Sequence, residues 1–569
     1  MNQPSCRSRP PGGTKPRQIG VHRRLSPAGP TGPTRRGLVL ILVLIVIAML
    51  SLGAYSFTNL MLAHHEAAVI TGRQAQTRSL VDSGVTAVQL FLSQSADDRA
   101  AAGGIYDNAQ HFRAVTVLED DNYKDRGCFS VIAPGIDSDG NVSGIRHGLE
   151  DESTRLNLNV LLILDKQSPG SGRTLLMGLP GMTEDVADAI LDWLDPDDDQ
   201  RELGSEVEYY SSLSPAYAPK NGPVDTVEEL LLVKGVTPQL LFGADSNRNG
   251  QLDQHELTQD TGDTVSTDAT GFRGWSSFLT IYSVEWNITP DGNPKVYLNT
   301  NDLNKLVDDL GAAGLNADWI NFIVAYRQAG PSGGGGGGGG AAAGAAGATT
   351  TGTAGAAGAA TAGATTPGNT PVAAGSGELN MDLQPQTTIG SILDLVGAQV
   401  QYTFQGGMAP STLASPFADG AYASYLPQLM DYVTVNPAAT IPGRININQC
   451  SSTVLSGIPG MTSDISSKIL AQRTIDSTSA DPARKYETWL LSESIVTLPQ
   501  MKILMPFING GGNAYRAQIV GYFQGGQAAS RVEAVFDATS PLPRIVLWRD
   551  LTHLGRGYPL DTLGVNYSQ

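Results

Sequence analysis

Apolar residues run without a break over residues 38–50, directly behind Arg35, Arg36 and Gly37. Residues 53–57 extend the run towards the ~20 residues that an α-helix needs to cross a bilayer. A secretory signal carries its small-residue cleavage site behind the apolar core, whereas here the small residue precedes that core. The pattern predicts a single membrane span that stays in the mature protein, and a plain signal anchor is the alternative.

Beyond the span, apolar residues recur every three or four positions up to about residue 98, which predicts one long helix that leaves the membrane. A strand is then predicted over residues 128–132, and its partner after the turn at Asp139 and Gly140. Three alternating segments near the C-terminus predict strands of one antiparallel sheet. These segments are residues 516–523, 531–536 and 544–548.

Three short segments share one form: a basic residue, alternating apolar residues and a final Asn. They are residues 155–159, 295–299 and 444–448. Each segment predicts a short strand whose final Asn caps the helix that follows. Their spacing is far longer than the ~20–50 residues of solenoid repeats, so they indicate a duplicated structural unit.

Charge divides the chain into a basic leader and an acidic remainder. Residues 1–37 hold eight Lys and Arg residues and no Asp or Glu, and the whole chain carries a formal net charge of −18. Removing those eight positive charges leaves −26. Positive charge stays on the cytoplasmic side of a membrane, so the acidic remainder is expected on the other side. Such an acidic surface repels nucleic acid and attracts cations.

Residues 328–376 consist mostly of Gly, Ala and Thr and carry almost no charge. This composition cannot bury a hydrophobic core, so it predicts a flexible linker between two folded parts.

Two segments carry the Pro-Gly turn of a helix-hairpin-helix motif. The first turn contains Pro180 and Gly181, the second contains Pro459 and Gly460, and apolar residues at helical spacing follow each turn. In many proteins the amides of such a turn bind DNA phosphate. A phosphate-binding turn is surrounded by Lys and Arg, whereas Asp and Glu follow the first turn. We therefore expect these hairpins to pack against protein.

Residues 245–256 match the twelve-residue loop of an EF-hand. Gly250 lies at the sharp bend, Gln251 would supply a main-chain carbonyl, and Glu256 would bind Ca²⁺ through both carboxylate oxygens. The two neutral Asn ligands lower the charge of the site, which favours weak binding suited to an extracytoplasmic supply. The predicted side-chain ligands are Asp245, Asn247, Asn249, Asp253 and Glu256.

A second acidic cluster lies between residues 192 and 206. Oxygen ligands at this density suit Ca²⁺, and a solvated acidic turn is the alternative. The predicted ligands of this second possible site are Asp195, Asp197, Asp199 and Glu206.

The junction of a basic leader, Gly37 and an apolar helix resembles that of type IV prepilins and type II secretion pseudopilins. A larger set of segments resembles the K-type minor pseudopilin of type II secretion. These segments are residues 150–159, 179–182, 193–195, 215–217, 221–223, 227–230, 444–448 and 458–461.

The resemblance implies cleavage between Gly37 and Leu38 by a prepilin peptidase, with methylation of the new N-terminus. Leu42 would then stand at mature position five, where most of the superfamily carries Glu and the K-type members do not. It further implies Ca²⁺ binding and assembly at a fibre tip with other minor pseudopilins and inner-membrane components of the secretion system. The protein would cross the inner membrane once, with its C-terminal domain in the periplasm.

The expected fold class is α+β: a transmembrane pilin-like helix, a small antiparallel sheet and inserted helical domains with helix-hairpin-helix motifs. We predict six parts. They are the leader 1–37, the N-terminal helix 38–100, a pilin-like part 101–160, a helical domain 161–327, the linker 328–376, and a second hairpin part with C-terminal strands 377–569.

The predicted function is protein export by assembly, not catalysis, because the sequence contains no HExxH metal motif and no Walker phosphate loop. The alternative is a membrane-anchored helix-hairpin-helix protein that binds or takes up DNA. The charge of −26 argues against that alternative, so no nucleic acid partner is expected.

Overall fold

A computed structural model describes residues 36–251, 253, 256, 273–332, 378–406, 410–476, 478 and 481–565. Nearly all of the predicted leader and of the predicted linker lies outside these residues. The chain divides into two compact units, Met1–Val69 and Ile70–Gln569, and each is described by itself.

Helix α1 (Arg36–Leu92) begins in the first unit and continues into the second. Its apolar side chains from Val39 to Leu62 are exposed, although Leu, Ile and Val at this density are normally buried. Within the described residues, α1 is the one helix that is long and apolar enough to cross a membrane. The single span predicted from the sequence therefore agrees with the structure.

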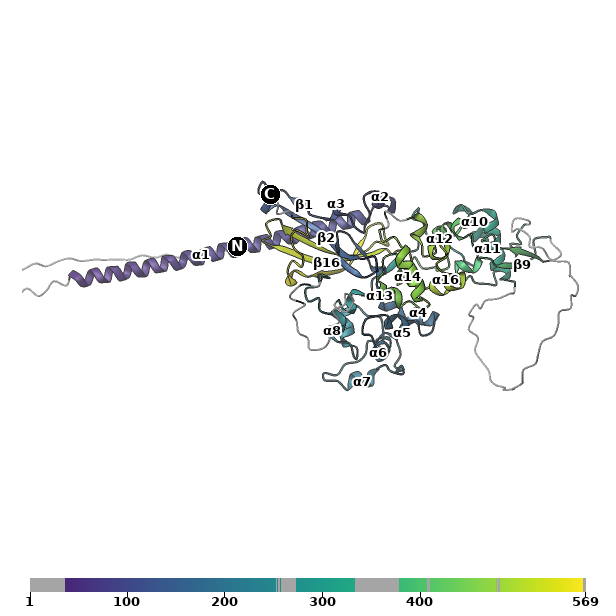
Figure 1. The fold of residues 1–569 in the computed structure, drawn as a ribbon, viewed down its shortest axis with the longest axis horizontal. Coiled ribbons are helices and arrows are strands. Elements are labelled where there is room, and N and C mark those ends of the chain that lie inside the picture. Colours follow the sequence, from purple (N-terminus) through teal and green to yellow (C-terminus); the bar gives the residue numbers. More distant parts are fainter. Residues whose placement is uncertain are drawn as a thin grey trace, which may run out of the picture. The chain divides into compact units, whose positions relative to one another are not determined.

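The main sheet of the second unit is antiparallel and joins distant parts of the chain (Figure 1). Its central strand β15 (Ala514–Phe523) pairs with β2 (Gly127–Ile136) on one side and β16 (Ala529–Asp537) on the other. The outer strands are β1 (Val115–Leu118), β3 (Val142–Arg146), β4 (Glu150–Asp151) and β17 (Arg544–Asp550). The strand pair after Gly140 and the three C-terminal strands are thus confirmed.

The second half of α1 packs on one face of this sheet. Val81, Val85 and Val88 of the helix share a buried cluster with Phe129 and Ile519 of the strands. A Cβ at Gly84 would lie 2.7 Å from the Ile519 side chain, so only Gly allows this close approach. The three-residue and four-residue spacing along α1 therefore reflects a buried helix face. The long helix is confirmed, but it ends at Leu92, before the predicted end near residue 98.

Three small parallel strand pairs each begin at one copy of the sequence repeat. Strand β5 (Leu156–Asn157) pairs with β6 (Leu279–Thr280), and β8 (Val296–Tyr297) pairs with β11 (Val433–Thr434). Strand β13 (Ile445–Asn446) pairs with β14 (Ile508–Asn509). Each copy of the repeat therefore supplies the first strand of a parallel pair, and a strand later in the chain supplies the second. This shared arrangement is the duplication that the sequence indicates.

The prediction that the final Asn of each copy caps a helix is wrong. Asn159 instead bonds the backbone N–H and carbonyl of Val224, and Asn299 bonds the same two groups of Ile389. Asn448 accepts a bond from the Trp489 indole. These side chains tie each short strand to a loop far along the chain, because an amide can both donate and accept.

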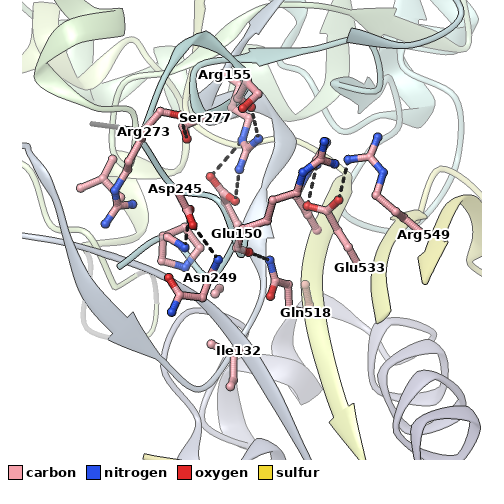
Figure 2. A pocket seen from close by; sticks show the side chains of 18 of the residues that line it. Ile132, Glu150, Arg155, Asp245, Asn249, Arg273, Ser277, Gln518, Glu533 and Arg549 are labelled. Atoms are coloured by element: carbon pink, nitrogen blue, oxygen red, sulfur yellow. Dashed lines mark hydrogen bonds and ion pairs between the residues drawn. The ribbon is translucent and has the colours of Figure 1, made fainter. Parts of the chain in front are cut away.

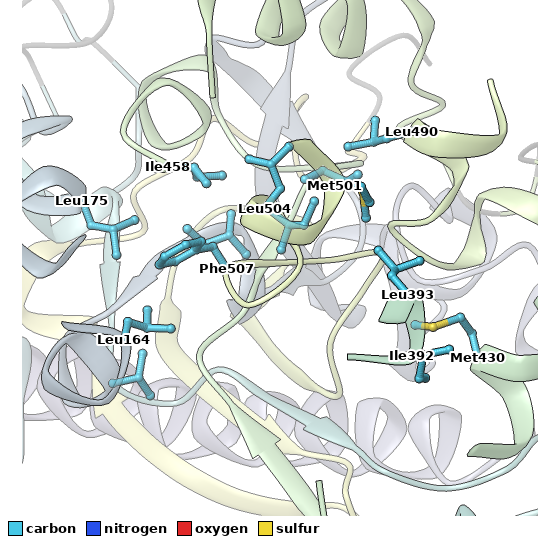
Figure 3. Packing of buried hydrophobic residues seen from close by; sticks show 14 of the residues in the cluster. Leu164, Leu175, Ile392, Leu393, Met430, Ile458, Leu490, Met501, Leu504 and Phe507 are labelled. Carbon is cyan, nitrogen blue, oxygen red and sulfur yellow. The ribbon is translucent and has the colours of Figure 1, made fainter. Parts of the chain in front are cut away.

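The helices that follow the three copies of the sequence repeat share one hydrophobic core. Figure 3 shows Leu164 and Leu175, which follow the first copy, near Ile458 and Phe507, which follow the third. Its helices are α4 (Leu161–Gln167), α5 (Ser171–Met177), α6 (Glu184–Leu194), α10 (Leu303–Ala312), α11 (Ala317–Ala329), α12 (Leu426–Tyr432), α13 (Ser452–Ser456), α14 (Ser463–Gln472), α15 (Trp489–Ser492) and α16 (Leu498–Leu504).

The remaining elements are short. They are α2 (Ala96–Ala101), α3 (Ala109–Phe112), α7 (Val207–Ser211), α8 (Pro238–Phe242), the strands β7 (Val284–Trp286), β9 (Gln399–Tyr402), β10 (Ser411–Ala414) and β12 (Thr440–Pro442), and short 3₁₀ helices such as η4 (Val227–Leu232) and η5 (Trp275–Ser277). Cys128 and Cys450 are both buried free thiols. The described chain is thus a mixed helix and sheet protein with a long apolar N-terminal helix.

Candidate functional site

The EF-hand-like loop follows α8 and closes on itself through Asp245. The carboxylate of Asp245 accepts bonds from the amides of Asn249 at 3.1 Å and Gly250 at 2.7 Å. Arg248 and Gly250 have positive φ angles of 55° and 70°, which turns the chain sharply between them. Asn247 Oδ1 accepts from the Asn249 amide at 2.9 Å, and the loop therefore has the inward-facing oxygens that a cation loop needs.

Glu256 and Asp253 complete this ring of oxygens. Glu256 accepts bonds from the Ser246 amide at 2.9 Å and the Asp253 amide at 3.0 Å. One oxygen of Asp253 accepts from the side-chain amides of Asn247 at 2.7 Å and Asn249 at 3.0 Å. The structure thus brings five of the predicted side-chain ligands into one hydrogen-bonded loop.

Burial and like charge act on this loop. Burial raises the pKa of Asp245, and the charge of Glu256 raises it further. A divalent cation would offset both effects, because it stabilises the charged form of the carboxyl groups. Among the described residues, no three carboxylate, His or Cys groups lie close enough to hold an ion by themselves. The loop would therefore need its Asn side chains and the Gln251 carbonyl as ligands.

The loop lies beside a cavity of about 120 Å³ against the main sheet. Figure 2 shows Asp245 and Asn249 on one wall and Gln518 close to them. The other walls carry charged pairs such as Arg155 with Glu150. Because these Arg and Glu side chains neutralise one another, the cavity does not present a charge of one sign.

The acidic cluster after α6 differs from the loop, since several of its buried oxygens have no hydrogen-bond partner. They are Asp195 Oδ1, both carboxylate oxygens of Glu206, and Asn221 Oδ1. Glu206 is 4% exposed and Asp195 is 7% exposed. Buried polar atoms almost always have a partner, so these four oxygens are acceptors that a water or a cation would satisfy. No three carboxylate, His or Cys groups of the described residues lie close enough together to hold an ion by themselves.

Asp192 and Arg201 hold the cluster together from inside. Asp192 is fully buried, accepts a bond from the Ser205 amide at 2.8 Å and forms an ion pair with Arg201 at 3.2 Å. Arg201 also pairs with Asp195. A Cβ at Gly204 would lie 1.9 Å from Asp192 Oδ2, so this position requires Gly.

Glu206 has the most perturbed carboxyl group of the cluster. Its burial, with the charges of Asp192 and Asp195, raises its pKa to about 7. The charged form is thus disfavoured near neutral pH unless a cation is bound beside it.

The structure brings together only part of the predicted second site. Asp195 and Glu206 are buried in the cluster, whereas Asp197 and Asp199 are exposed. Asn221, which the prediction omitted, enters the cluster by donating to the Asp197 carbonyl and to Asp198, each at 2.9 Å. Its signal in the sequence was weak, because one Asn in front of a Gly is also typical of a turn.

Each Pro-Gly turn contacts protein on one side, while its glycine, Gly181 or Gly460, is exposed. The Trp275 indole donates to the Pro180 carbonyl at 2.8 Å, and a Cβ at Gly181 would meet Leu240 at 3.5 Å. Pro459 precedes Gly460, where a Cβ would meet Ile503 at 2.9 Å.

The two hairpins also touch each other, because a Cβ at Gly178 would lie 2.6 Å from the Cα of Gly457. Helix α6, which follows the first turn, starts with Glu184 and Asp185. These surroundings favour a packing role over phosphate binding.

The predicted processing site lies at the start of α1. Gly37 and Leu38 belong to this helix, and the residues before Arg36 lie outside the described part of the chain. The structure therefore does not test cleavage, which stays a prediction.

Residues 154–242 match the family model of the type II secretion system (T2SS), protein K. The match covers the first repeat, the first hairpin and the acidic cluster, and it ends shortly before the EF-hand-like loop. It confirms the resemblance to K-type minor pseudopilins that the sequence predicts.

The search of curated proteins found no match. Among solved structures, the crystal structure of the GspK-GspI-GspJ complex from the enterotoxigenic Escherichia coli type 2 secretion system is similar to this chain at 10% identity. The similarity covers 86% of this chain and 98% of that chain, with a TM-score of 0.28. At this TM-score the two chains are not shown to share a fold.

Proposed function

We propose that this chain is a minor pseudopilin that stands at the tip of a type II secretion pseudopilus and acts in protein export by assembly. The observation that carries this proposal is the match of residues 154–242 to the protein K family. Helix α1 supports it, since its exposed apolar half suits packing among sister helices, first in the bilayer and later in the fibre.

The tip position follows from one residue of α1. After cleavage at Gly37, Leu42 occupies mature position five, where most relatives carry a Glu. That Glu would pair with the terminal amine of a neighbouring subunit, and a charge left unpaired in lipid is costly. Leu42 cannot make this pair, so a subunit above it is not needed. The partners proposed are other minor pseudopilins, inner-membrane components of the secretion system and the prepilin peptidase.

We propose that Ca²⁺ binds at both acidic regions. The loop would hold it through Asp245, Asn247, Asn249, Asp253, Glu256 and the Gln251 carbonyl, and the cluster through Asp195, Glu206 and Asn221, with Asp197 and Asp199 as outer ligands. When bound, the ion supplies positive charge to buried carboxylates. The four partnerless oxygens of the cluster support this proposal.

The proposed role is assembly, with no catalysis and no nucleic acid partner. Gly181 and Gly460 are exposed, but Glu184 and Asp185 follow the first turn and would repel a phosphate group. The acidic start of α6 therefore argues against DNA binding at the first hairpin.

Co-purification tests the assembly role. The full chain in detergent is mixed with each sister minor pseudopilin of the same secretion system, and with the major pseudopilin as a control. We expect a stable complex with one or more minor pseudopilins. A chain that binds none of them, and instead binds duplex DNA at low salt, would contradict the proposal and favour the DNA-binding alternative.

A further inference from the structure

We propose that the EF-hand-like loop is a cation-dependent clasp that fastens the helical part of the protein to the main sheet. This inference rests on the proposed binding of Ca²⁺ at residues 245–256. It concerns the outer side of the loop, where three successive carbonyls meet three side chains of the sheet region.

The contacts of this outer side come from residues 247–249. The Asn247 carbonyl accepts a bond from Arg531 Nη2 at 2.5 Å, and the Arg248 carbonyl accepts one from Gln518 Nε2 at 2.7 Å. The Asn249 carbonyl accepts from the Tyr558 hydroxyl at 3.1 Å. One run of backbone is therefore bonded to β16, β15 and the C-terminal segment at once.

Two of the three side-chain donors are buried, Gln518 is half-buried, and the three hold one another in place. Arg531 is fully buried and Tyr558 is 4% exposed. Gln518 Oε1 accepts from the Tyr558 hydroxyl at 2.9 Å and from Arg531 Nη1 at 3.3 Å. A buried Arg whose donors lose their acceptors is costly, so the loop carbonyls satisfy a group that the sheet cannot satisfy by itself.

Cation binding and docking share the same peptide groups. The amides of Asn249 and Gly250 donate inward to the Asp245 carboxylate. In a trans peptide the N–H and the C=O point in opposite directions. The carbonyls that belong to these two peptides, those of Arg248 and Asn249, are therefore turned outward to Gln518 and Tyr558.

An ion that fixes Asp245 thus also fixes the direction of the docking carbonyls. The two events are thermodynamically linked, and the linkage is reciprocal: loss of a docking contact must weaken cation binding by the same factor by which the cation strengthens docking. The clasp closes only where free Ca²⁺ is abundant, because two neutral Asn ligands favour weak binding.

The test measures Ca²⁺ affinity in a variant that changes no ligand. Tyr558→Phe removes the hydroxyl whose single proton lies between the Asn249 carbonyl and Gln518 Oε1, so it weakens the docking of this carbonyl and the support of Gln518. Tyr515→Phe is the matched control, because the buried Tyr515 hydroxyl donates to the Gly512 carbonyl at 2.8 Å and not to the loop. Both changes are made in a full-length Asp195→Asn, Glu206→Gln background in detergent, so that calorimetric titration with CaCl₂ reports the loop.

We expect Tyr558→Phe to raise the dissociation constant about three- to tenfold, the usual size for one lost hydrogen bond, while Tyr515→Phe matches the parent. Hydrogen exchange gives a second measure: Ca²⁺ should slow exchange at residues 556–558 in the parent and less in Tyr558→Phe. Equal affinities for the two variants, with no protection at 556–558, would overturn the clasp and leave the cation site standing. A parent that binds no Ca²⁺ at all would overturn the cation site and the clasp with it.

Discussion

The two acidic regions proposed to bind Ca²⁺ differ in whether their carboxylates already have hydrogen-bond donors. In the loop at 245–256, the backbone amides of the loop already satisfy the carboxylates of Asp245 and Glu256. In the cluster, Glu206 is buried with no donor on either oxygen. A loop of the first kind is a preformed cage, whereas a site of the second kind is incomplete until an ion or a proton arrives.

The two regions also differ in how well their ligands can be predicted from the sequence. The ligands of the loop can be predicted because they follow one another in a known order. The cluster could be predicted only in part, because Asn221 joins it through bonds to Asp197 and Asp198 from a distant segment. The match to the protein K family includes the cluster and ends before the loop. The family match therefore bears on the cluster and not on the loop.

The largest expected effect is the loss of all bound Ca²⁺. At a hundredfold excess over the dissociation constant, each site should add about 2.7 kcal/mol to the free energy of unfolding. Chelator should therefore lower the melting temperature of the purified protein, and the Glu206→Gln, Glu256→Gln double variant should no longer respond to Ca²⁺. A full Ca²⁺ response that persists in the double variant would show that neither region binds the ion.

The next effect is a pH dependence to which Glu206 of the cluster contributes most among the two acidic regions. Without Ca²⁺, burial and the charges of Asp192 and Asp195 raise the pKa of Glu206 from 4.5 to about 7. Between these values the folded state keeps a proton that the unfolded state has lost, so stability must fall as pH rises from 4.5 to 7.

The expected fall is about 3 kcal/mol at most, at about 1.4 kcal/mol for each pKa unit. Urea unfolding in chelator at several pH values measures it, and Glu206→Gln should flatten the slope. Ca²⁺ should restore stability near pH 7. An unchanged slope in Glu206→Gln would refute the assignment of this proton.

A third effect lies within the loop. Glu256 would supply two coordinating oxygens and Asn247 one, so Glu256→Gln should weaken Ca²⁺ binding more than Asn247→Ala does. Titration calorimetry of both variants in the Glu206→Gln background ranks them. The reverse order would mean that the loop does not coordinate its ion as an EF-hand does.

The smallest effect concerns Asn221, which would contribute one neutral oxygen to the cluster. Asn221→Ala should cost about 1 kcal/mol of Ca²⁺ binding there, similar to one hydrogen bond, and should leave the loop untouched. Asn316→Ala removes an Asn that caps α11 and belongs to neither site, and it is the control. If both variants bind Ca²⁺ equally well, Asn221 is not a ligand.

Local pattern predicted much of the fold. The apolar run gave the exposed half of α1, and alternation gave β2, β15, β16 and β17 within a few residues. Where partners are distant, prediction failed: Asn159 was expected to cap the next helix and instead bonds Val224. An Asn at the end of a short strand can either cap the next helix or bond a distant segment. The sequence around it is the same in both cases, so only the tertiary fold decides which role it has.

The contact between the two hairpins could likewise not be predicted from the sequence. Gly178 and Gly457 are in contact although each is an ordinary Gly in front of an apolar residue and a Pro. The surroundings of Pro180 were partly predictable, because the acidic residues of α6 already argued against DNA. The contacts of this turn with Trp275 and Leu240 could be seen only in the structure.

N-terminal sequencing of the mature protein tests the central claim, that this chain is a pseudopilin, most directly. The account predicts a mature chain that begins at Leu38, with a methylated amine, when the prepilin peptidase is present, and an uncut chain when the peptidase is absent. A chain that stays uncut in the presence of the peptidase, or that begins anywhere within residues 50–70, would contradict it.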